Sequence, residues 1–171
     1  MALRVTLTLT FVLKIISEDK IMEMIASFQI DHNTLKPGCY VSRIDGDITT
    51  YDLRFIKPNT PPYIDTKALH TIEHLFATYA RNSRFGGNII YFGPMGCRTG
   101  FYLIVRELSS LDTLTLIRET LESAINHQGE IPGSKPVECG NAAEHDLEGA
   151  KAEMTKYYET IKDLTIFDLQ Y

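Results

Sequence analysis

The 171-residue sequence has no tryptophan and only three cysteines, Cys39, Cys97 and Cys139. An odd and sparse set of cysteines does not form a disulfide framework, so we expect free thiols and a reducing, cytoplasmic setting. Basic residues are outnumbered by acidic ones, 17 to 22, and they form no lysine- or arginine-rich run. This charge balance argues against a general nucleic-acid binder.

Long apolar runs are also missing. No stretch approaches the ~20 consecutive apolar residues that a membrane span needs. The nearest candidate, residues 5–16, is interrupted by Lys14 and leads into Glu18-Asp-Lys20 without a small-residue cleavage site. This pattern predicts neither a signal peptide nor a membrane anchor.

The length and composition suit one domain. A content of 44% hydrophobic and 23% charged residues is ordinary for a globular chain that buries its own core. No internal repeat or long linker divides the sequence. We predict a single domain over residues 23–171 and interpret residues 1–22 as an N-terminal extension, which by hypothesis is non-native, with Met22 or Met24 as the natural start.

Hydrophobic periodicity predicts several strands and three main helices. Apolar residues alternate or cluster between turn residues, which predicts strands at 25–30, 49–56, 88–92 and 101–105. Apolar stripes at helical spacing predict helices at about 65–81, 110–126 and 142–162. Together these elements predict an α+β fold, a single domain with an antiparallel sheet packed with three main helices.

The first of these helices carries the motif His70-Thr-Ile-Glu-His74. Residues four apart project from the same face of a helix, so His70 and His74 are candidate ligands of one metal ion. Glu73 lies on nearly the same face and is a candidate acid or base beside the metal. The H-x-x-E-H pattern is also typical of inverted zincin peptidases, and a helix histidine pair is often no more than partly exposed surface.

A catalytic zinc-type site usually has three protein ligands and one open position, so a third ligand is needed. Cys139, in Val137-Glu-Cys-Gly-Asn141, precedes the last predicted helix and is one candidate; the alternative is a buried, unreactive thiol. Cys97 lies among glycines in Gly93-Pro-Met-Gly-Cys-Arg-Thr-Gly100. Arg98 beside it would favour the reactive thiolate, unless the glycines only form a tight turn around an ordinary cysteine.

Several motifs occur jointly and in order: His70-Thr-Ile-Glu-His74-Leu, Pro94-Met-Gly-Cys-Arg-Thr-Gly100, Glu138-Cys-Gly140 and His145-Asp-Leu-Glu-Gly-Ala-Lys151. Together they closely resemble the S-ribosylhomocysteine lyase (LuxS) family of bacterial autoinducer-2 synthesis. The upstream segments Ser27-Phe-Gln-Ile-Asp-His32 and Asp52-Leu-Arg-Phe-Ile-Lys-Pro-Asn59 fit as well. The resemblance extends from about Ser27 to the C-terminus.

The resemblance implies a metal site of His70, His74 and Cys139, with Fe²⁺ expected and Zn²⁺ or Co²⁺ as substitutes. It implies a carbon–sulfur lyase (EC 4.4.1.21) that moves the ribose carbonyl from C1 to C3. β-Elimination then releases homocysteine and 4,5-dihydroxy-2,3-pentanedione, the autoinducer-2 precursor of quorum sensing and a by-product of the activated methyl cycle. Cys97 and Glu73 would be the acid–base pair that carries the protons.

The resemblance also implies a homodimer with active sites at the interface. Ser27, His32 and Arg54 match positions that line the substrate pocket from the partner subunit; taken alone, His32 reads as a turn residue and Arg54 as a solvated strand residue. Tyr91 stands where many family members have aspartate, so binding of the homocysteine end is expected to differ. His127 and His145 are not expected to be ligands, and His145 is expected to support the Cys139 loop.

Two alternatives remain at this point. A metallopeptidase of the inverted zincin type would use a downstream glutamate as third ligand and gives Cys97 and Cys139 no role. A non-catalytic metal-binding module would need a fourth protein ligand to close the site, and none is obvious in the sequence. Neither alternative releases homocysteine from S-ribosylhomocysteine.

Overall fold

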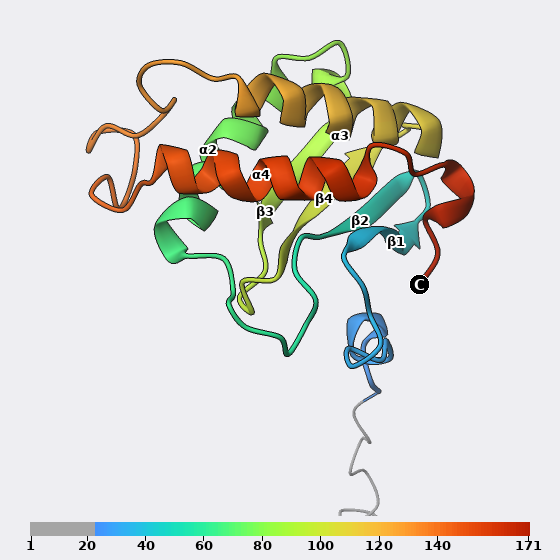
Figure 1. Ribbon diagram of the computed structural model, residues 1–171. Helices are drawn as coiled ribbons and strands as arrows, with labels where there is room; N and C mark the ends of the chain where they lie inside the picture. The colour runs from blue at the N-terminus through green and yellow to red at the C-terminus, as the bar shows by residue number, and fades with distance from the viewer. Residues whose placement is uncertain (1–22) are drawn as a thin grey trace, which may run out of the picture.

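The computed structural model describes residues 23–171, in which three helices cover one sheet (Figure 1). The strands are β1 (Gly38–Asp45), β2 (Ile48–Arg54), β3 (Ile89–Pro94) and β4 (Gly100–Arg106), paired antiparallel in the order β1-β2-β4-β3. The helices are α2 (Thr66–Arg81), α3 (Ser110–Ile125) and α4 (Leu147–Ile161), with 3-10 turns η1 (Ala26–Phe28), η2 (Gly86–Asn88) and η3 (Ile166–Asp168). The predicted α+β fold is confirmed. The N-terminal extension, residues 1–22, lies outside the described residues.

The core lies between the sheet and the helices. Alternate side chains of β2 and β4 are buried, among them Leu53, Phe101 and Leu103, each with no exposed surface. α2 contributes Ile72 and Phe76 to the same cluster. Because each fully buried aliphatic side chain stabilises the fold by about 1.5–3 kcal/mol, this packing holds α2 firmly against the sheet.

Each helix begins at a polar cap. The side chain of Asp65 accepts a hydrogen bond from the backbone N–H of Lys67 at the start of α2, where the sequence predicts a cap. Asp146 does the same for α4 by accepting from the N–H of Gly149. The last helix therefore begins at Leu147, and its expected start near residue 142 is wrong. Residues 142–146 form instead the end of the loop that approaches α2.

Two strand assignments differ from expectation. Residues 25–30 do not form a strand, because they have no neighbouring strand to pair with; the segment folds back on itself as η1, with the N–H of Phe28 donating to the carbonyl of Ile25 at 2.9 Å. β1 was not predicted, since its alternation is weak. Its pairing with β2, from Gly38 opposite Arg54 to Asp45 opposite Ile48, makes it a strand.

Within residues 23–171, no helix has both the length and the apolar character that crossing a bilayer requires.

Candidate metal centre and a separate cavity

The two histidines of α2 present free nitrogens on one side of the helix. The Nδ1 atom of His70 is 2.9 Å from the carbonyl oxygen of Glu144, and that of His74 is 2.9 Å from the carbonyl oxygen of Pro132. A carbonyl only accepts, so both rings carry their proton on Nδ1 and keep the lone pair of Nε2 free. Such a backbone partner is typical of histidines that bind a metal.

The loop between α3 and α4 brings Cys139 to these histidines. The Cys139 sulfur is 3.5 Å from Nε2 of His70 and accepts a hydrogen bond from the backbone N–H of Asn141 at 3.4 Å. Gly133 lets the loop approach α2: its φ is +69°, and a Cβ there would lie 3.3 Å from Nδ1 of His74. The loop therefore places a thiol beside two imidazoles.

His145 belongs to the same cluster. Candidate ligand atoms of His70, His74, Cys139 and His145 all lie within 4.8 Å of one another. The ring of His145 stacks on that of His70, with centroids 4.2 Å apart, and its Nε2 is 3.9 Å from the Cys139 sulfur. His145 was expected to support the Cys139 loop and not to be a ligand, whereas the structure places it among the candidate ligands.

A buried threonine sets the tautomer of His145. The hydroxyl of Thr71 donates its proton to the carbonyl of Lys67 at 2.8 Å, so at 3.2 Å it accepts from Nδ1–H of His145. The lone pair of His145 Nε2 then faces the cluster. Burial, followed by the nearby His70 and His74, lowers the pKa of His145, which favours the neutral imidazole that a metal binds. The Asp146 N–H also donates to Thr71, which ties the loop to α2.

The donor set fits a divalent metal. Three imidazoles with a free Nε2 and one thiol that can ionise are ligands that zinc, iron and cobalt accept. His127, the other histidine of this region, is engaged elsewhere, since its nitrogens contact the Tyr79 hydroxyl at 2.8 Å and the Glu130 carbonyl at 2.9 Å. Glu73 is half-buried on α2 and makes no hydrogen bond or ion pair with any residue in the described range.

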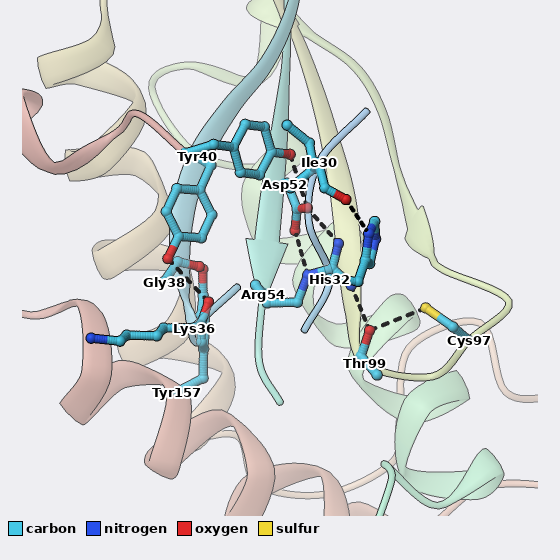
Figure 2. A network of polar contacts seen from close by, with 11 residues as sticks. Ile30, His32, Lys36, Gly38, Tyr40, Asp52, Arg54, Cys97, Thr99 and Tyr157 are labelled. Atoms are coloured by element: carbon cyan, nitrogen blue, oxygen red, sulfur yellow. Dashed lines mark hydrogen bonds and ion pairs between the residues drawn. The ribbon is translucent and has the colours of Figure 1, made fainter. Parts of the chain in front are cut away.

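A cavity of about 400 Å³ lies elsewhere in the fold, and four predicted site residues line it: Ser27, His32, Arg54 and Cys97. Its lining shares no residue with the metal cluster, and no hydrogen bond within residues 23–171 joins the two. Cys97 is exposed on the turn between β3 and β4. The Nδ1 of His32 contacts the carbonyl of Ile30 at 2.8 Å, which leaves its Nε2 free (Figure 2).

Arg54 is buried rather than solvated. It is 2% exposed and forms an ion pair with Asp52, which is 1% exposed. The Tyr171 hydroxyl donates to the same Asp52 carboxylate at 3.0 Å. The Arg54 guanidinium also donates to the Thr99 hydroxyl, which contacts the Cys97 sulfur (Figure 2). Arg98, which we expected to act on Cys97, forms no ion pair with a described residue.

Sequence reasoning missed Asp52 and Thr99. The sequence does give one indication for Asp52, since residues two apart in a strand project from the same face and Asp52 therefore lies on the face of Arg54.

Tyr91 lies beside this cavity. It is 49% exposed and lines a neighbouring hollow of about 350 Å³, to which Ser27 and Tyr102 also contribute. Ser27 and Tyr102 thus border both hollows. An altered binding mode at Tyr91 stays a prediction.

Comparison with known proteins shows the family to which the chain belongs. A family model described as S-ribosylhomocysteinase (LuxS) matches residues 25–166. Proteins named S-ribosylhomocysteine lyase from Borreliella afzelii and Finegoldia magna are 45% and 46% identical, and each alignment covers 88% of this chain and 99% of the relative. The corresponding protein of Phocaeicola vulgatus is 46% identical over 88% of this chain and 98% of its own length. The chain therefore belongs to the S-ribosylhomocysteinase (LuxS) family.

Proposed function

We propose that this protein is an S-ribosylhomocysteine lyase that releases homocysteine and 4,5-dihydroxy-2,3-pentanedione, the precursor of autoinducer-2. The observation that carries this proposal is the convergence of His70, His74 and Cys139 in a chain of this family, with Glu73 next to His74 on α2. Relatives that carry the lyase name leave the peptidase alternative without support.

The metal would be held by His70, His74 and Cys139. When bound, a divalent ion supplies Lewis acidity toward an oxygen of the substrate's ribose. The mixed imidazole and thiolate donor set suits Fe²⁺, which we propose as the resident metal, and Zn²⁺ or Co²⁺ as substitutes. The carbonyl oxygens of Glu144 and Pro132 would hold the two α2 imidazoles in the ligating orientation.

Glu73 and Cys97 would carry the protons. Moving a carbonyl along a sugar requires a base to take a proton from one carbon and an acid to deliver one to its neighbour. Elimination of homocysteine then requires loss of a further proton. Glu73 is suited to transfer protons next to the metal because its carboxylate has no hydrogen-bond or ion-pair partner among the described residues. Cys97 is suited to transfer protons because its exposed thiol lines the cavity.

We place the active site between two copies of the chain. Cys97 shares its cavity with Ser27, His32 and Arg54, whereas Glu73 and the ligands lie on and around α2. Within one chain the Cys97 cavity and the metal cluster are therefore separate sites. A homodimer in which the cavity of one subunit faces the metal cluster of the other would combine them into one active site. In this arrangement Ser27, His32 and Arg54 bind the substrate.

We propose no nucleic-acid or membrane partner. The free state of all three cysteines supports a cytoplasmic location.

The activity is tested by incubating the metal-loaded protein with S-ribosylhomocysteine and titrating the released thiol. We expect one equivalent of thiol per substrate consumed, because elimination at C5 frees homocysteine. An absence of thiol release by protein of verified metal content would refute the proposed function.

The shared active site is tested by mixing two inactive variants, Cys97→Ala and Cys139→Ala, and allowing subunits to exchange. A mixed dimer has one site in which both the cavity and the metal ligands are intact. We expect recovery of roughly one quarter of wild-type activity, since about half of the dimers are mixed and each has one intact site of two. If each active site lay within one chain, every site would keep a defect and no activity would return.

A further inference from the structure

The Asp52–Arg54 pair holds a guanidinium in one orientation behind Cys97. Arg54 donates from Nε to one oxygen of Asp52 at 3.1 Å and from Nη2 to the other at 2.5 Å. Tyr171 donates to the second of these oxygens at 3.0 Å. Two-point contact of this kind fixes the plane of the guanidinium, and its Nη1 is left to point at Thr99.

The hydrogen bond between Arg54 and Thr99 has one possible direction. A guanidinium only donates, so the Thr99 hydroxyl accepts from Nη1 of Arg54 at 2.5 Å. Thr99 is 2% exposed, and the other polar contact of its oxygen is the Cys97 sulfur at 3.1 Å. A Cys97 thiolate has no proton to donate, so in that form the Thr99 hydroxyl is the donor and the sulfur is the acceptor of the contact drawn in Figure 2.

The backbone around Thr99 keeps this geometry in place. Its carbonyl accepts from the N–H groups of Phe55 and Ile56, both at 3.0 Å. Gly100 lies opposite Arg54 in the β2–β4 ladder, and a Cβ there would be 2.3 Å from the carbonyl oxygen of Leu53, so only glycine permits the close approach. These contacts involve main-chain atoms and persist when the Thr99 side chain is changed.

We propose that Thr99 is a positioning residue that hydrogen-bonds the Cys97 sulfur and links it to the positive charge of Arg54, so that the thiolate is favoured. A hydrogen bond to the charged form of a group stabilises that form, and a nearby guanidinium acts in the same sense. The other titratable groups that line the cavity are His32 and Tyr102, and Arg98 follows Cys97 in the turn. This inference rests on the proposed proton-transfer role of Cys97.

The test follows alkylation of Cys97 by iodoacetamide in the metal-loaded protein from pH 5 to 10, with peptide mass spectrometry to assign each cysteine. We expect Thr99→Val to move the midpoint of the rate–pH profile up by about one pH unit and to slow alkylation about tenfold below the midpoint. Thr99→Ser keeps the hydroxyl and should retain the wild-type profile. Burial, then Asp52, raises the pKa of Cys39 to about 12, so Cys39 should stay unmodified and report that the fold is intact.

An unchanged profile in folded Thr99→Val protein would overturn the proposal, as would a Thr99→Ser profile equal to that of Thr99→Val. Thr99→Ala carries the same comparison if the valine variant does not fold. Alkylation needs no turnover, so its result is independent of whether the protein cleaves S-ribosylhomocysteine. With turnover established, Thr99→Val should lower kcat more than it changes KM, and Thr99→Ser should restore kcat.

Discussion

Replacement of Cys139 by alanine is expected to abolish stoichiometric metal binding and, with it, lyase activity. The thiolate would be the only anionic ligand in a cluster whose other members are neutral imidazoles. Structural zinc sites with four protein ligands bind with about 10–16 kcal/mol, so the loss of one of the three proposed ligands should cost on the order of 3 kcal/mol, or more than about 100-fold in affinity. Metal content after gel filtration, measured by elemental analysis, gives the result.

Cys97→Ala is the matched control for this variant, because it removes a thiol from the separate cavity. It should retain full metal content. His74→Ala should behave like Cys139→Ala. Full metal occupancy in either ligand variant would remove that residue from the ligand set.

Glu73→Gln and Cys97→Ala are expected to keep the metal and lose turnover. Each removes one proton carrier while it leaves the ligands of the cluster in place. General acid–base catalysis typically contributes about 100- to 10,000-fold, so kcat should fall by this range in each variant. Steady-state thiol release, normalised to measured metal content, separates this loss from a loss of metal.

Glu144→Gln is a suitable control for Glu73→Gln. Glu144 also lies close to the cluster, but it contacts His70 through its backbone carbonyl, which the substitution retains. It should therefore keep near-wild-type kcat. Near-normal turnover in Glu73→Gln or Cys97→Ala would exclude the residue concerned from proton transfer.

Local patterns were sufficient for most elements of the fold. The apolar stripe and the cap at Asp65 predict α2 almost to the residue, and alternation predicts β2. Residues 25–30 were assigned wrongly and β1 was missed for the same reason. Whether an extended segment becomes a strand depends on a partner strand that its own sequence does not specify.

The family motifs also carried the identities of the candidate ligands. His70, His74 and Cys139 were named from the sequence, and the structure brings them together. The tautomers depend on distant carbonyls at Pro132 and Glu144, and these contacts cannot be read from spacing. His145 was set aside because its place in the cluster comes from Thr71, more than seventy residues earlier in the chain.

The sequence by itself determined the class of the protein, its α+β architecture and the set of residues that can bind a metal or exchange protons. Only the tertiary structure decided which of those residues lie in the cavity and which lie in the metal cluster. Cys97 lies with Ser27, His32 and Arg54 in one cavity, and the ligands lie in another place. It also showed that Arg54 is buried against Asp52 and reaches Cys97 through Thr99. The physical reason is that hydrogen bonds and burial depend on distances between segments remote in the chain, which residue spacing along the sequence does not encode.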